Sequence, residues 1–186
     1  MAKQFDILNT DRREFILRQH IFFTASATQQ SKVNVSPREI GALRIIDDNT
    51  VIYLDRTGSG NETAAHMLVD GRITVMFCAF SGPPQIMRLY GKGTALGWDS
   101  AEFKQLIAQH YGGDTPLGAR QIMRIEFDLV QTSCGYGVPL FDYEGERAAI
   151  ENWHDNKGPD GIQSYWKEKN LSSMDGLPTG LKLEDE

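Results

Sequence analysis

The sequence predicts a mainly β fold with peripheral helices, in which an antiparallel sheet closes or folds over on itself. Over roughly the first half of the chain, strand-like runs follow one another too closely for helices to separate them. Turn-forming residues at 47–50 and 81–84 join consecutive runs, and tight turns connect antiparallel strands, whereas parallel strands need long crossovers. The sheet is therefore expected to be mostly antiparallel and strongly curved.

Length and composition indicate one domain of ordinary globular type. The 186 residues are 40% hydrophobic and 24% charged, with a formal net charge of -6. An acidic chain is not expected to use nucleic acid or an anionic membrane as its main partner. No apolar run reaches the roughly 20 residues of a membrane span, and residues 1–6 lack a signal-peptide core, so a cytoplasmic location is expected.

The cysteines and histidines do not indicate a metal centre. Cys78 and Cys134 are expected to be reduced thiols, and the histidines at positions 20, 66, 110 and 154 lack metal-ligand spacing. Cys134 is expected to be an inert thiol because no lysine, arginine or second cysteine stands nearby to activate it. We expect no structural metal.

The N-terminal third begins with a short amphipathic helix over 10–19, capped by Thr10 or Asp11. A strand is predicted over 20–27, where aromatic and β-branched residues are frequent. Residues 32–37 alternate polar and apolar, which predicts a half-buried strand that Pro37 closes. One face of this strand carries Val33 and Val35, and the other carries the polar Asn34 and Ser36, two possible ligand contacts.

Four further strands are predicted before residue 96. Residues 43–46 and 51–54 form a hairpin across the turn at 47–50. Residues 72–80 form a further predicted strand, and residues 85–95 return as its antiparallel partner.

Between these two hairpins lies the loop of residues 55–63, which is the strongest candidate site. Gly58 and Gly60 let the backbone turn tightly and approach a ligand, and Asn61 to Thr63 then begin a short helix. A helix N-terminus after such a loop can hold a phosphate, because unpaired N–H groups and the helix dipole point the same way. The alternative is a connecting loop without a ligand, since such composition is common in turns.

The remaining chain alternates helix and strand signals. A capped helix is predicted over 99–111 and a long strand over 119–133. Helices are predicted over 147–153 and 161–170, ahead of a turn-rich tail. We divide the chain into a barrel domain over 1–143 and a helical or irregular extension over 144–186 that packs on the same domain.

Several segments, in this order, resemble the pyridoxamine 5'-phosphate oxidase-like family of FMN-binding split barrels. The resemblance covers roughly residues 22–139 and rests on these segments: Asn34-Val35-Ser36-Pro37, Arg44-Ile45-Ile46, residues 49–55, Gly58-Ser59-Gly60-Asn61-Glu62-Thr63, Gly71-Arg72-Ile73 and residues 88–93. The chain is most similar to a branch that also carries Thr132-Ser133-Cys134-Gly135-Tyr136-Gly137-Val138-Pro139, not to the vitamin B6 oxidases themselves. The resemblance implies a six-stranded antiparallel split barrel and a homodimer with one FMN in each of two clefts between subunits.

The same resemblance implies the cofactor-binding residues. Arg44 matches the start of the first flavin-contacting strand, where it would contact the phosphate or ribityl chain, and Ile45 and Ile46 would present backbone to the ring. The other implied contacts are Tyr53 and Leu54 on the second flavin-contacting strand, Asn61, Glu62 and Thr63 at the phosphate, and Arg88.

Two departures separate the chain from the vitamin B6 oxidases. Glu62-Thr63 stands where those enzymes carry Arg-Lys, which leaves backbone N–H groups, the Thr63 hydroxyl and Arg44 or Arg88 for the phosphate. The arginine-containing terminal motif that grips their substrate is also missing. Tyr136 could stack on a flavin or on the partner chain, or fill its own turn.

The expected function is that of an FMN-binding oxidoreductase acting on an unidentified small molecule. A flavin brings its own redox chemistry, and no catalytic acid or base can be named from the sequence. The alternatives are a non-catalytic flavin- or haem-binding protein or sensor on the same barrel, and a barrel that has lost its ligand and serves as an interaction module.

Overall fold

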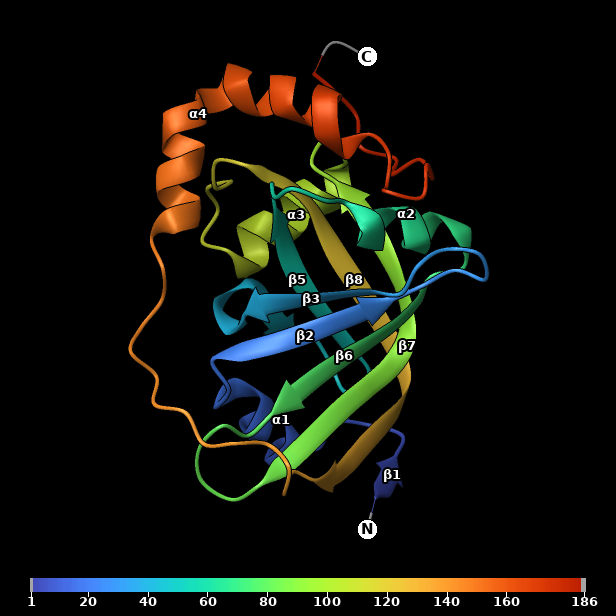
Figure 1. Cartoon of the computed structure of the whole chain (residues 1–186), viewed down its shortest axis with the longest axis vertical. Coiled ribbons are helices and arrows are strands. Elements are labelled where there is room, and N and C mark those ends of the chain that lie inside the picture. The colour runs from blue at the N-terminus through green and yellow to red at the C-terminus, as the bar shows by residue number, and fades with distance from the viewer. Residues whose placement is uncertain (1, 185–186) are drawn as a thin grey trace.

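The computed structural model describes residues 2–184 and shows one curved sheet of eight strands with helices around it (Figure 1). The strands are β1 (Lys3–Phe5), β2 (Ile21–Ser26), β3 (Asn34–Glu39), β4 (Leu43–Ile45), β5 (Thr50–Arg56), β6 (Arg72–Cys78), β7 (Gln85–Gly97) and β8 (Ala119–Cys134). The helices are α1 (Thr10–Leu17), α2 (Glu62–Val69), α3 (Ala101–His110) and α4 (Ala149–Tyr165), with a 3-10 turn η1 (Ile40–Ala42) and a π turn η2 (Trp166–Asn170).

The sheet has the order β3-β2-β6-β7-β8-β5-β4, with β1 paired to β8, and all these pairings are antiparallel. The predicted mainly β, antiparallel split-barrel fold is confirmed, but the expected count of six strands is wrong. β8 runs long enough to pair with β7, β5 and β1, and the short strands β1 and β4 extend the sheet. The pairing of β7 with β8 shifts register between Tyr90 and Gly91. A Cβ at Gly91 would lie 2.1 Å from the Glu126 carbonyl oxygen, so the close approach of the two strands requires glycine there.

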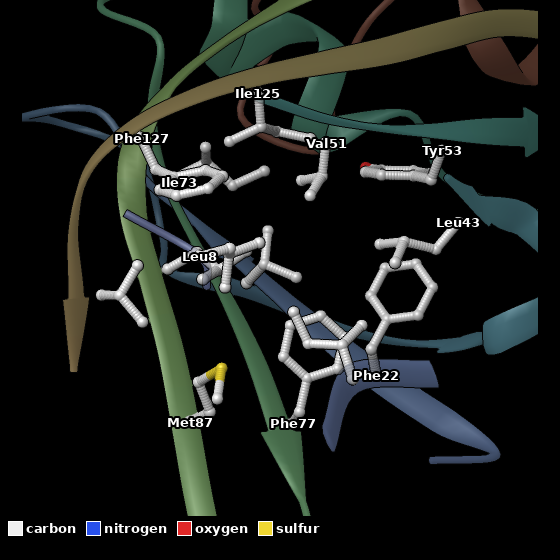
Figure 2. Close-up of a cluster of buried hydrophobic side chains, with 14 of the residues drawn as sticks. Leu8, Phe22, Leu43, Val51, Tyr53, Ile73, Phe77, Met87, Ile125 and Phe127 are labelled. Carbon is white, nitrogen blue, oxygen red and sulfur yellow. The ribbon is translucent and has the colours of Figure 1, made fainter. Parts of the chain in front are cut away.

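The main core fills the inside of the curved sheet (Figure 2). Its fully buried members include Phe22, Tyr53, Phe77 and Leu89, which come from four different strands. Phe22 packs edge-on against Tyr53, with ring centroids 5.6 Å apart. A second cluster buries Phe103 and Ile107 of α3, together with partly buried neighbours, against β5 and β8.

Three details of the predicted strands and helices need correction. Asn9, rather than Thr10 or Asp11, caps α1, because its side chain accepts the Arg12 N–H at 3.1 Å. Pro37 does not close its strand, since β3 lies at an end of the sheet path, where a missing N–H costs no ladder bond. The longest strand is the 16-residue β8, whereas the predicted strand over 72–80 ends at Cys78 after 7 residues.

The C-terminal helices follow the prediction with different bounds. α4 is interrupted at Gly158, whose φ of 64° is left-handed, and Pro159 follows directly. Ile162, Trp166 and Leu181 form a small third cluster at the far end of this segment. In Figure 1 the segment crosses above the end of the sheet where α2 and α3 lie.

Candidate functional site

A polar cleft of about 520 Å³ lies beside the loop that joins β5 to α2. Its walls come from β3, the end of β5, this loop and the first turn of α2, the start of β8, and two residues of the C-terminal segment, Ile150 and Met174. The lining residues are Asn34, Ser36, Pro37, Arg38, Asp55, Arg56, Gly58, Ser59, Gly60, Asn61, Glu62, Thr63, Arg120, Ile150 and Met174. This volume lies within the range of small-molecule sites.

The loop presents backbone to the cleft. At Gly58, an added Cβ would have no atom within 4 Å, so this side of the loop is open. At Gly60, a Cβ would lie 2.2 Å from a carboxylate oxygen of Glu62, so only glycine lets Glu62 lie over the loop. The Asn61 side chain does not cap α2, because its oxygen accepts from Gln121 at 2.6 Å and its amide donates to the Asn170 carbonyl at 3.2 Å.

Asp55 forms a buried ion cluster with two arginines at the floor of the cleft. Its side chain is only 1% exposed, and its Oδ2 accepts from Arg120 Nε at 2.7 Å and from Gln121 Nε2 at 2.8 Å. Its other oxygen accepts from Arg38 Nη1. Arg120 also donates to the Gly60 carbonyl at 2.8 Å, which ties the cluster to the loop.

The charges of this cluster determine the protonation of Asp55. Burial alone would raise the pKa of Asp55, but the charges of Arg120 and Arg38 and the hydrogen bonds from Arg120 and Gln121 outweigh burial and lower the pKa to about 2. The carboxylate is therefore ionised and fully paired, and it is unsuited to serve as a catalytic base. Burial also lowers the Arg38 pKa, but Asp55 more than reverses this effect, so Arg38 stays charged.

Asn61, Glu62 and Thr63 are the predicted site residues that line the cleft. Thr63 Oγ1 accepts a hydrogen bond from Asn34 Nδ2 at 3.1 Å, so the polar face of β3 meets the first turn of α2. Asn34 and Ser36, the possible contacts on that face, also line it.

The other predicted residues lie outside this cleft. The Arg44 guanidinium donates to the His110, Gly41 and Leu43 carbonyls and lies over the Tyr111 ring. Arg88 lies 3.4 Å from the Ser133 hydroxyl. Ile45, Ile46, Tyr53 and Leu54 pack in the hydrophobic clusters. The resemblance implies cofactor clefts between two subunits, so the cofactor contacts of Arg44, Arg88 and these four residues stay predictions.

Sequence reasoning missed Arg38 and Arg120 as members of the site. Arg38 shares the polar face of β3 with Asn34 and Ser36, and this alternation is the signal that could have identified it. Arg120 is a buried charge at the start of β8, where unpaired arginine is rare. Their meeting with Asp55 depends on the pairing of Asp55 with Gln121 between β5 and β8, which the local pattern does not specify.

A second cavity, of about 690 Å³, lies between the ends of β2 and β3 and the segment 141–150. His20 and Tyr143, which both line it, stack with ring centroids 3.7 Å apart.

Tyr136 lies in the turn after β8 and is 84% exposed, so this side chain does not fill its own turn. Cys78 and Cys134 are free.

Two further findings concern residues 2–184. Within them, no group of three or more His, Cys, Asp or Glu side chains could hold a metal ion. None of the helices in this part of the chain has the length and apolar character needed to cross a membrane.

Comparisons with solved structures identify the same architecture elsewhere. A histidine-to-alanine variant of HupZ from Group A Streptococcus is 17% identical, with a TM-score of 0.55, and the match covers 67% of this chain and 98% of that one. A putative pyridoxamine 5'-phosphate oxidase from Lactobacillus delbrueckii is 11% identical, with a TM-score of 0.52, over 68% and 94% of the two chains. HutZ, the haem storage protein of Vibrio cholerae, is 16% identical, with a TM-score of 0.50, over 69% and 97%. At these identities the likeness establishes the fold alone.

At the level of sequence, the chain is similar to a characterised family over most of its length. The pyridoxamine 5'-phosphate oxidase family protein ustO of Aspergillus flavus is 32% identical over 192 residues, covering 94% of this chain and 76% of that protein. The model of the pyridoxamine 5'-phosphate oxidase family matches residues 8–134, which include all eight strands except β1. The chain therefore belongs to the pyridoxamine 5'-phosphate oxidase family.

Proposed function

We propose that the protein is an FMN-binding flavoprotein that works as a homodimer and oxidises or reduces an unidentified small molecule. The observation that carries this proposal is the polar cleft, where an open glycine loop and the start of α2 meet three arginines. Backbone N–H groups at a helix start and guanidinium groups are the donors that bind phosphate best in proteins.

The residues of the cleft fit the anionic end of such a cofactor. Asp55 neutralises only one of the two guanidiniums that contact it, which leaves the cluster of Arg38, Asp55 and Arg120 with one net positive charge. Arg120 Nη1 is buried without a hydrogen-bond partner among residues 2–184. These arginines would supply the charge that Glu62-Thr63 lacks, in place of the Arg44 and Arg88 expected from the sequence.

The chain's own residues would bind and orient the cofactor. A bound flavin supplies the hydride and electron chemistry itself. Asn34, Ser36 and Thr63 would donate or accept hydrogen bonds at the cleft wall, and Ile150 and Met174 would provide its apolar contacts. Ionised Asp55 would hold Arg120 against the Gly60 carbonyl and so fix the loop.

Purification and cofactor extraction test this proposal directly. Purified protein should show the flavin absorbance bands, and mass spectrometry of the extract should identify FMN. Colourless protein that also refuses added FMN would contradict the proposal. Reduction of the bound flavin by NAD(P)H, followed by turnover with oxygen or another acceptor, is the expected sign of an oxidoreductase.

A non-catalytic binding protein is the second candidate. It is favoured by the pairing of the buried carboxylate of the cleft with arginines, and by the fold shared with a haem storage protein. This candidate predicts a bound flavin that no nicotinamide reduces, or haem in place of flavin in the extract.

A pair of glycine variants tests the position of the cofactor. Gly58→Ala should weaken FMN binding about tenfold or more, because a methyl group would occupy the space where the phosphate approaches the backbone. Gly41→Ala is the matched control, since a Cβ there also meets no atom within 4 Å, and it lies outside the cleft. FMN fluorescence titration measures both affinities, and equal affinities would place the phosphate elsewhere.

A further inference from the structure

The C-terminal segment lies beyond the family match over residues 8–134, and its side chains hydrogen-bond to the loop of the cleft. Trp166 Nε1 donates to Thr57 Oγ1 at 2.7 Å, and Asn170 Nδ2 donates to the Gly58 carbonyl at 3.2 Å. From the other side, Thr57 donates to the Gly118 carbonyl through its N–H at 2.7 Å and through its hydroxyl at 2.8 Å. The loop is therefore fixed between this segment and the start of β8.

His154 occupies the centre of this contact. It is fully buried, and its ring packs so closely on Gly118 that a Cβ there would lie 2.5 Å from the ring. Its Nδ1 lies 2.9 Å from Arg56 Nη2, and its Nε2 lies 3.1 Å from the Thr57 carbonyl oxygen. Both Arg56 and Thr57 belong to the strand and loop that form the cleft.

These partners determine the tautomer of His154. A guanidinium has donors and no acceptor, so Nδ1 must accept from Arg56, and a carbonyl only accepts, so Nε2 must carry the proton. A second proton on the ring would place an N–H on Nδ1, facing a cation with no acceptor to receive it. The neutral ring is therefore the form that fits the observed contacts.

We propose that His154 is a pH-sensitive positioning residue, whose neutral ring holds Arg56 and Thr57 in the geometry that binds the anion and whose protonation releases them. This inference rests on the proposed function, because the anion is taken to be the FMN phosphate. Release would free the Arg56 side chain, which also pairs with Glu151 at 2.6 Å, and would loosen the loop at Thr57.

The charges around the ring give the direction of the switch. Burial lowers the pKa of His154 and Arg56 lowers it further, whereas the Thr57 hydrogen bond, Glu151 and Asp155 raise it; the net effect is a pKa below the usual value. The contact is therefore intact at neutral pH and is lost only as the pH falls below the ordinary pKa of histidine.

The matched variant for this test is His154→Gln. The glutamine amide offers one donor for Thr57 and one acceptor for Arg56, as the neutral ring does, and it does not titrate. His154→Ala removes both contacts at every pH. His110→Gln, at the end of α3 and outside the cleft, controls for the loss of a histidine in general.

The first readout is FMN affinity at about pH 7.5 and about pH 5, on either side of the histidine range. The FMN phosphate itself titrates near pH 6, and that effect is common to all variants. The wild type and His110→Gln should lose about tenfold more affinity in acid than His154→Gln, within the usual range of coupling between sites. His154→Ala should bind weakly at both pH values. Parallel losses in the wild type and His154→Gln would overturn the proposal.

The second readout is independent of the cofactor. Hydrogen exchange of residues 57–61 in ligand-free protein, corrected for the intrinsic pH dependence, should rise in acid for the wild type and stay constant for His154→Gln. Equal exchange in both proteins would overturn the role of His154, even if FMN binds. Absence of FMN binding at neutral pH, with exchange as expected, would overturn the proposed function and leave the switch in the loop established.

Discussion

Asp55 is the residue on which the organisation of the cleft depends. A buried carboxylate is costly unless it is paired, and here two guanidiniums and the Gln121 amide satisfy it. Because Arg120 also reaches the Gly60 carbonyl, the same carboxylate that stabilises the sheet also positions the loop. Stability and ligand binding should therefore respond together when Asp55 changes.

Asp55→Asn should lower the free energy of unfolding by about 3 to 5 kcal/mol, because it leaves two arginines without their buried counter-charge. Urea denaturation measures the loss. Asp48→Asn is the matched control, since it removes an exposed ion pair with Arg13 and should cost no more than about 1 kcal/mol. Similar losses in the two variants would mean that the Asp55 cluster contributes little.

Acid should remove the contribution of Asp55. Its folded pKa is about 2, below its ordinary value of 3.8, so its stabilisation is fully present above pH 4 to 5 and disappears as the pH falls toward 2. The shift corresponds to about 2 kcal/mol. The unfolding free energy measured between pH 5 and pH 2 should fall more steeply in the wild type than in Asp55→Asn; identical slopes would contradict the assignment.

At the scale of elements, the loop after β5 is held by parts of the chain that are distant in sequence. Arg120 of β8 and Gly118, just before that strand, contact it from one part of the chain. The segment formed by α4 and η2 contacts it through His154, Trp166 and Asn170. The loop itself therefore needs little intrinsic structure. Its glycines remain free to expose backbone toward the cleft.

Trp166→Phe tests this support. The change keeps an aromatic ring but removes the donor to Thr57, so the free energy of unfolding should fall by about 1 to 3 kcal/mol and FMN affinity should fall with it. The control is Trp98→Phe, because Trp98 donates to the Lys182 carbonyl in an exposed contact and water can replace it. Thermal or urea unfolding and FMN titration give both quantities. Equal effects in the two variants would contradict a specific role for Trp166.

At the scale of the whole molecule, the curved sheet ends in β3 on one side and β4 on the other. β3 forms one wall of the cleft through Asn34 and Ser36, and Val35 on its other face is 59% exposed. Val33, directly before the strand, is 71% exposed. An exposed apolar face on an edge strand beside a ligand cleft is typical of a subunit contact. This arrangement supports the proposal of a dimer with the cleft at its interface.

Light scattering should therefore give a mass of about twice the 20.9 kDa of one chain. Val35→Lys should shift the protein toward the monomer and weaken FMN binding, because a charge would be buried in the contact. Leu17→Lys, which replaces another exposed apolar side chain at the end of α1, should change neither. A monomeric wild type that binds FMN with unchanged affinity would exclude the shared cleft.

Much of the fold followed from local patterns. Hairpin turns, alternation and the capped helix α3 have their causes within a few residues, so these elements were predictable, and the loop with Gly58 and Gly60 was recognisable as a site. The cap at Asn9, the continuation of β3 through Pro37 and the end of β6 at Cys78 were not. The cap is a local contact, but Asn9, Thr10 and Asp11 are all residue types that cap helices, so the pattern does not choose among them. The other two depend on a position in the sheet that local pattern does not reveal.

The sequence by itself determined the mainly antiparallel fold, the family and the position of the glycine loop, because these depend on short-range periodicity and on ordered motifs. Only the tertiary structure decided which charges surround that loop. Arg38, Asp55 and Arg120 are far apart along the chain and meet through β5 pairing with β8 and through the approach of β3, while Arg44 is held by backbone carbonyls elsewhere. The physical reason is that a charge binds what lies within a few ångströms of it, and strand pairing sets those distances.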